Sequence, residues 1–130
     1  MTKAEHIAYW RDAAAFDWPP VQRMMAAGDH VHGLFFAHLI IEKLSKAHWV
    51  KDNEGSIPPR IHHITKLWAA TKLAPTPAQM TTANELNGYQ IEGRYPEYVR
   101  QLYASTTPAL AKSLFTEITA LRTWLLSTLP

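Results

Sequence analysis

Residues 34–47 constrain the fold of this chain more than any other segment, because they are apolar around nearly the whole circumference of a helix. A helix of this kind is buried on more than one face. His38, Glu42 and Lys46 follow one another at intervals of four residues within it, so they form one polar line along the helix. Buried polar groups cost free energy unless they find partners. We therefore expect this line to contact another part of the fold, a second subunit or a ligand.

The composition indicates one folded domain that spans residues 1–130, because 47% of the residues are hydrophobic and 18% are charged. Because so few residues are charged, we expect part of the surface to be apolar and to be covered by a second subunit. The net charge of +2 is too small for a dedicated binder of duplex DNA. The lack of cysteine excludes disulfides, thiolate metal sites and cysteine nucleophiles. Neither a signal segment nor a charge-free stretch of the roughly 20 residues that span a bilayer is present, so we expect a cytoplasmic protein without membrane contact.

Hydrophobic periodicity predicts helices over residues 4–27, 30–50, 62–72, 77–89 and from 107 onward. No strand-like alternation competes with this pattern. The predicted fold class is all-α, an up-and-down bundle of four to five helices.

Prolines 19 and 20 leave two alternatives for the first helix, since each proline removes a backbone donor. Either the helix kinks and continues, or a new helix begins with Asp17 as its N-cap. We expect one kinked helix that ends at Gly28, where glycine supplies the left-handed conformation typical of helix ends.

Other boundaries follow from capping signals and from glycine. Thr76 and Gln79 have the spacing of a capping box, and Thr107 precedes Pro108 as Thr76 precedes Pro77. Residues 87–97 contain two glycines and a proline, so we expect a loop there.

Several short motifs occur in an order that is characteristic as a set. They are Gly28-Asp29, Leu34-Phe35-Phe36, His38-Leu39, Glu42-Lys43-Leu44, Lys46-Ala47, Pro58-Pro59, His62-His63 with Leu67, and Gly93-Arg94-Tyr95-Pro96. This series resembles the HEPN domain, a nucleotide-binding module named for its occurrence in higher eukaryotes and prokaryotes. The resemblance extends from about residue 9 to residue 125.

The resemblance implies an up-and-down helical bundle that forms a homodimer. It also implies a partner, since many members of the family act beside a minimal nucleotidyltransferase in a toxin–antitoxin-like pair. One branch of the family consists of metal-independent ribonucleases. In that branch an arginine and a histidine, separated by four to six residues late in the fold, act on the ribose 2′-hydroxyl and the scissile phosphate.

The chain departs from this ribonuclease pattern. Arg60 is followed too closely by His62 and His63, and no histidine follows any later arginine. Arg23 and His30 have the right separation, but they straddle the first turn and not the late helical position. General acid–base catalysis needs a group that titrates near neutrality. The sequence therefore favours a protein that is not an enzyme of this kind.

Arg94 and Tyr95 are the first candidates for ligand contact. An arginine can bind a phosphate or carboxylate through two parallel hydrogen bonds, and a tyrosine ring can stack on a base. The alternative is structural: Arg94 pairs with Glu42 or Glu97, and Tyr95 packs in the core. We favour Glu42 as the partner of Arg94.

Glu42, Lys43 and Lys46 form the second group of candidates. The two lysines are three residues apart and share a helix side, where they could flank an anion. The alternative is an internal salt bridge.

His62 and His63 are the third group, expected at the start of a helix, where one could donate to a phosphate or cap the helix. Adjacent residues point to different sides of a helix, so we predict no metal site, and no cofactor other than a nucleotide ligand.

The sequence thus predicts a homodimeric module that binds a nucleotide or RNA through Arg94, Tyr95, Glu42, Lys43, Lys46, His62 and His63. Two alternatives remain. One is a metal-independent ribonuclease with a degenerate motif, and the other is a protein-interaction module without a ligand.

Overall fold

The computed structural model describes residues 1–92 and 96–130, and all the regular secondary structure in these ranges is α-helical. The helices are α1 (Lys3–Ala26), α2 (His30–Asp52), α3 (Ile64–Ala69), α4 (Pro77–Glu92), α5 (Pro96–Ser105) and α6 (Pro108–Ser127). The predicted all-α class is confirmed. The described residues form six helices where four or five were predicted, because Pro96–Ser105 is helical.

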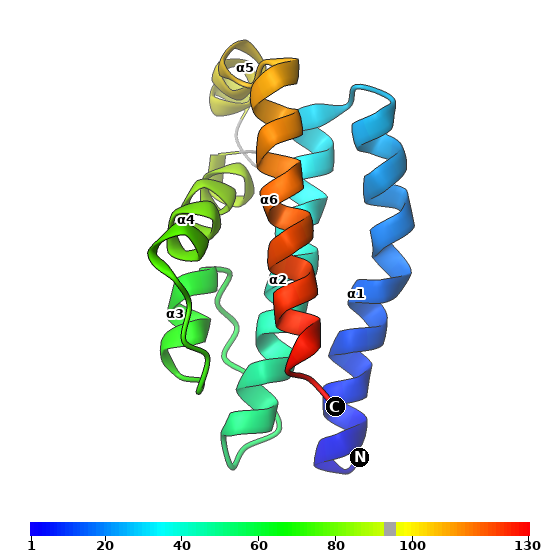
Figure 1. Cartoon of the computed structure of the whole chain (residues 1–130), viewed down its shortest axis with the longest axis vertical. Coiled ribbons are helices and arrows are strands. Elements are labelled where there is room, and N and C mark those ends of the chain that lie inside the picture. The colour runs from blue at the N-terminus through cyan, green and yellow to red at the C-terminus, as the bar shows by residue number, and fades with distance from the viewer. Residues whose placement is uncertain (93–95) are drawn as a thin grey trace.

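Helix α2 is the central element of the bundle. Figure 1 shows α1, α2 and α6 running along the long axis of the molecule, with α3 and α4 on the side of α2 away from α1. Fourteen of the 23 residues of α2 are buried, including Leu34, Ile41 and Val50. The prediction that this helix is buried on more than one face is confirmed.

Helix α1 continues through Pro19 and Pro20 as one helix. A proline inside a helix costs about 3 kcal/mol, so packing on the rest of the helix must offset it. Trp18 and Val21, which flank the two prolines, are buried in the main core. The alternative in which a new helix begins at Asp17 is wrong, since Asp17 lies within α1.

Two other predicted boundaries need correction. The third helix is shorter than residues 62–72, because His62 and His63 lie before its first residue and the backbone of His63 is extended. The predicted loop at residues 87–97 is also wrong at both ends. Helix α4 runs through Gly88 to Glu92, and α5 begins at Pro96.

Buried side chains explain why α4 tolerates a glycine. Asn87 and Tyr89 on either side of Gly88 are 6% and 7% exposed. The Tyr89 hydroxyl lies 2.8 Å from Thr106 Oγ1 at the end of the next helix. Tertiary contacts therefore override the local preference of glycine for a turn.

The capping signals at the helix starts are confirmed. Thr76 N–H donates to Gln79 Oε1 (2.8 Å), and Gln79 N–H donates to Thr76 Oγ1 (3.2 Å), which is the reciprocal pattern of a capping box. Thr107 accepts from the amide of Leu110 at the start of α6. Within the described ranges, none of these helices is long and apolar enough for a bilayer crossing.

Gly28 should tolerate a side chain poorly because of its backbone conformation. Its φ of 87° lies in the left-handed region, and an added Cβ would meet nothing within 4 Å, so the cost of Gly28→Ala is purely conformational. We expect Gly28→Ala to lower the free energy of unfolding by about 1 kcal/mol in urea denaturation.

Gly88→Ala is the matched control. Gly88 lies inside α4, and a Cβ there also meets nothing within 4 Å. This variant should be stabilised by about 0.5–1 kcal/mol. Equal changes in the free energy of unfolding for the two variants would contradict the left-handed conformation of Gly28.

Candidate functional site

The polar line that the sequence predicts on α2 is buried, and each of its members has a partner within the chain. His38, Glu42 and Lys46 are 0%, 5% and 8% exposed. A side chain of α4 contacts His38, a side chain of the segment before α3 contacts Glu42, and Lys46 contacts Glu42 within α2. The line therefore joins three parts of the fold.

The contact between Glu42 and His62 is the shortest interaction of this cluster. His62 Nδ1 donates to Glu42 Oε1 over 2.7 Å, and Lys46 Nζ lies 3.4 Å from Glu42 Oε2. The carboxylate side chain is 7% exposed, whereas the imidazole is 45% exposed. Within the part of the chain that the structure describes, His62 Nε2 has no hydrogen-bond partner. A buried carboxylate thus orients an imidazole whose other nitrogen faces outward from this contact.

Asn87 connects the remaining polar groups. Its Oδ1 accepts from His38 Nε2 (3.1 Å) and from the amide of Ile64, the first residue of α3 (3.2 Å). Its Nδ2 lies 3.5 Å from His63 Nδ1, which also accepts from Thr65 Oγ1 over 3.0 Å. One amide side chain therefore holds α2, α3 and α4 together.

Sequence reasoning missed Asn87, which lies where the predicted helix over residues 77–89 and the predicted loop over residues 87–97 overlap. The available signal was a polar residue beside Leu86 and Tyr89, both of which are buried. A polar residue in such a setting needs a partner, as the residues of the α2 line do.

Two buried histidines are held in the neutral form. Burial lowers the pKa of His38 below the ordinary value of 6.5, although the hydrogen bond with Asn87 opposes this shift. Burial likewise lowers the pKa of His48, whose Nε2 donates to the carbonyl oxygen of Leu125 over 2.7 Å. The Nδ1 atom of His48 has no partner in the described part of the chain, which fits an unprotonated nitrogen.

Both candidate lysines lie in internal ion pairs, which is one of the two roles expected for them. Lys43 Nζ is 2.6 Å from Asp17 Oδ2 of α1. Lys46 pairs with Glu42 and also lies 5.3 Å from the centre of the Trp10 ring. Their charges are therefore largely used within the fold.

Arg94 and Tyr95 lie outside the described residues. The expected contact of Arg94 with Glu42 therefore stays a prediction. Of the seven candidates, the structure brings Glu42, Lys46 and His62 into direct contact. Asn87 links His63 to His38, which lies on the same polar line of α2.

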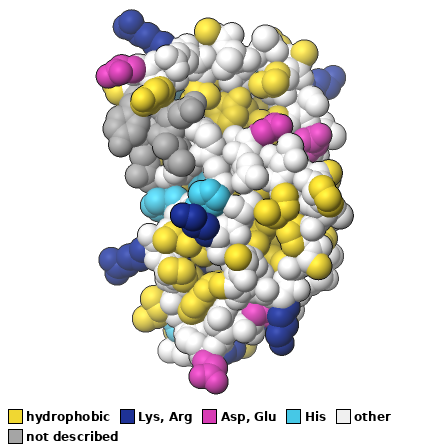
Figure 2. Space-filling view, turned by 90° about the vertical axis from the view of Figure 1, so that its left-hand side faces the viewer, with side chains coloured by type: hydrophobic (Ala, Val, Ile, Leu, Met, Phe, Trp, Pro, Cys, Tyr) yellow, Lys and Arg dark blue, Asp and Glu magenta, His cyan; other side chains and the backbone are white. Residues whose placement is uncertain are grey.

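Histidine and basic side chains lie next to one another on the face that α3 and α4 form (Figure 2). No three His, Asp or Glu side chains in residues 1–92 and 96–130 form a group that could hold a metal ion. Imidazole N–H groups can donate to phosphate oxygens, and an imidazole nitrogen without a proton can accept one. The chemistry available here is anion binding and proton transfer.

A family model described as HEPN domain matches residues 7–127, which is nearly the whole chain. Comparison with curated proteins and with solved structures gives no significant match.

The neutral state of His38 and His48 should make stability depend on pH. Both pKa values are lowered by folding, so below about pH 6.5 the unfolded chain binds protons that the folded chain does not. The stabilisation is complete above pH 6.5 and is lost as the pH falls. The free energy of unfolding should drop by up to about 1.4 kcal/mol per pH unit for each histidine.

Urea denaturation between pH 7.5 and pH 5.5 measures this slope. Replacing one buried imidazole, in His48→Gln, should reduce the slope, whereas the control His6→Ala, at a partly exposed position of α1, should leave it unchanged. A free energy of unfolding that is constant over this range would contradict the neutral assignment.

Proposed function

The chain belongs to the HEPN domain family, and from this membership we propose that it binds a nucleotide or RNA through the face that carries His62 and His63. The observation that supports this proposal most is the hydrogen bond between His62 and the buried Glu42. A side chain that is already oriented loses less conformational freedom when a ligand binds. In the imidazolium form its second nitrogen also carries an N–H, which can donate to a phosphate oxygen.

We include Arg94 and Tyr95 in the proposed site on the basis of their chemistry. They follow directly after α4, the helix whose Asn87 contacts His63. The guanidinium would bind the phosphate through two hydrogen bonds, and the phenol ring would stack on the base. With Lys43 and Lys46 engaged in ion pairs, Arg94 is the cation best suited to this role.

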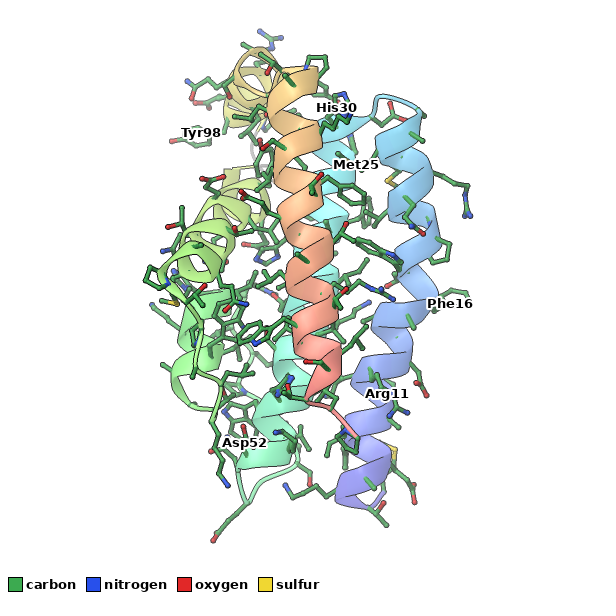
Figure 3. All side chains as sticks on the ribbon, in the orientation of Figure 1. Arg11, Phe16, Met25, His30, Asp52 and Tyr98 are labelled. Carbon is green, nitrogen blue, oxygen red and sulfur yellow. The ribbon has the colours of Figure 1, made fainter. Side chains whose placement is uncertain are left out.

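We further propose that the protein is a homodimer and acts with a minimal nucleotidyltransferase in a toxin–antitoxin-like pair. Exposed aromatic side chains support the need for a second subunit. Phe16 is 82% exposed and Phe36 is 40% exposed. Figure 3 shows Phe16 pointing away from the bundle. Exposed apolar side chains that form a contiguous patch are typical of a surface that another chain covers.

A second candidate function is metal-independent cleavage of RNA, and the same Glu42–His62 pair favours it. A carboxylate that holds one imidazole nitrogen fixes the tautomer and leaves the other nitrogen free to act as a general base. The late arginine–histidine motif of the ribonuclease branch is not present, so binding remains the first proposal.

Calorimetric titration with ATP, GTP and a short single-stranded RNA tests the binding proposal. We expect at least one of them to bind, and we expect His62→Ala and Arg94→Ala each to weaken binding about tenfold, the effect of one lost charge-assisted hydrogen bond. His6→Ala is the matched control, because it removes an imidazole from α1 and should leave the affinity unchanged.

The absence of heat with all three ligands would remove the nucleotide proposal in favour of a protein-interaction module. RNA incubated with the protein and a chelator separates the other candidate. Cleavage that persists in the chelator and disappears in His62→Ala would establish the ribonuclease and replace the binding proposal.

A further inference from the structure

A second concave site lies where the end of α1 meets the starts of α2 and α6. Its volume is about 530 Å³, within the range of roughly 300–1,000 Å³ that is typical of small-molecule pockets. It is lined in part by Met25 and His30, both labelled at this end of the bundle in Figure 3. It shares no residue with the cluster around Glu42.

The apolar part of this cavity contains an aromatic ring that is held in place. Phe115, which is partly buried, stacks on Trp18 with ring centres 5.3 Å apart and an interplanar angle of 20°. Arg122 lies 4.7 Å from the Trp18 ring centre, so the ring pair is fixed by a third side chain. Met25 adds a polarisable thioether beside Phe115. A flat aromatic group suits such a surface.

The polar part of the cavity favours negative charge. Lys112 lies at its edge, and in the described part of the chain its ammonium group has no partner. Gln22 and Thr116 add hydrogen-bonding groups, and none of the described lining residues is acidic.

The start of α6 strengthens this preference. Helices α2 and α6 both begin at the cavity, with His30 and Pro108, and neither has an acidic residue in its first turn. The side chain of Asp29, the N-cap of α2, makes no capping hydrogen bond. The partial positive charge at the start of α6 therefore adds to the charge of Lys112, whereas the carboxylate of Asp29 opposes the partial charge at the start of α2.

We propose that this cavity binds a small planar aromatic anion, with its ring on Phe115 and Met25 and its carboxylate or phosphate at Lys112. The site goes beyond the proposed function, since it is separate from the histidine face and takes a ligand of defined shape. A ligand with a ring but no charge would contact only the apolar part of the cavity, and an anion without a ring would contact only the polar part.

Titration of ¹⁵N-labelled protein with four probes tests the proposal. AMP and indole-3-acetate each carry a ring and an anion, while adenosine and inorganic phosphate each lack one of the two. We expect AMP, indole-3-acetate or both to give saturable shifts at residues 22–30 and 108–116, with adenosine and phosphate weaker. A response to AMP alone identifies a phosphate ligand, and a response to indole-3-acetate alone identifies a carboxylate.

Lys112→Ala should weaken the binding about tenfold, and because this side chain is exposed the variant should fold normally. Lys66→Ala, which removes an exposed lysine from α3, is the matched control and should change nothing. Absence of saturable shifts with both ring anions at millimolar concentration would overturn the proposal. Shifts centred on His62 that are lost in His62→Ala but kept in Lys112→Ala would also overturn it, while leaving the proposed function intact.

Discussion

One buried carboxylate, that of Glu42, constrains how the central helix can be packed. An ionised carboxylate in an apolar interior costs several kcal/mol unless charged or hydrogen-bonding partners surround it. Lys46, one turn along α2, supplies a charge, but at 3.4 Å it does not satisfy the carboxylate alone. His62 supplies the short hydrogen bond, so the chain before α3 must pass beside this point of α2. The need to satisfy Glu42 thereby fixes a segment that has no regular structure of its own.

The same constraint extends along α2 to His38 and from there to α4. His38 is fully buried and neutral, and Asn87 Oδ1 accepts the hydrogen bond from its Nε2–H while also accepting from the first amide of α3. A polar network of this kind specifies one arrangement of three helices, because any shift between them leaves several polar groups unpaired at once. Its surface consequence is a pair of neighbouring imidazoles in fixed positions. Binding of a phosphate-bearing ligand would use a geometry that the core already maintains.

Much of the fold follows from local patterns in the sequence. The periodicity of α2, the line of His38, Glu42 and Lys46, and the capping box at Thr76 depend on residues within two turns of one another, so they could be predicted. The partners of the polar line could not, because they lie 20 and 49 residues away in the chain, at His62 and Asn87. Gly88 and Pro96 led to the wrong prediction of a loop, again because distant residues decide the outcome. The contacts that keep those segments helical are tertiary and leave no mark in the local pattern.

A double-mutant cycle between Glu42 and His62 tests the central claim most directly. The free energy of unfolding would be measured for the wild type, Glu42→Gln, His62→Ala and the double variant. The account predicts a favourable coupling of about 1 kcal/mol, less than for a fully buried pair because the imidazole is partly exposed. Effects that add within about 0.3 kcal/mol would show that the two side chains are energetically independent, and the account would be contradicted.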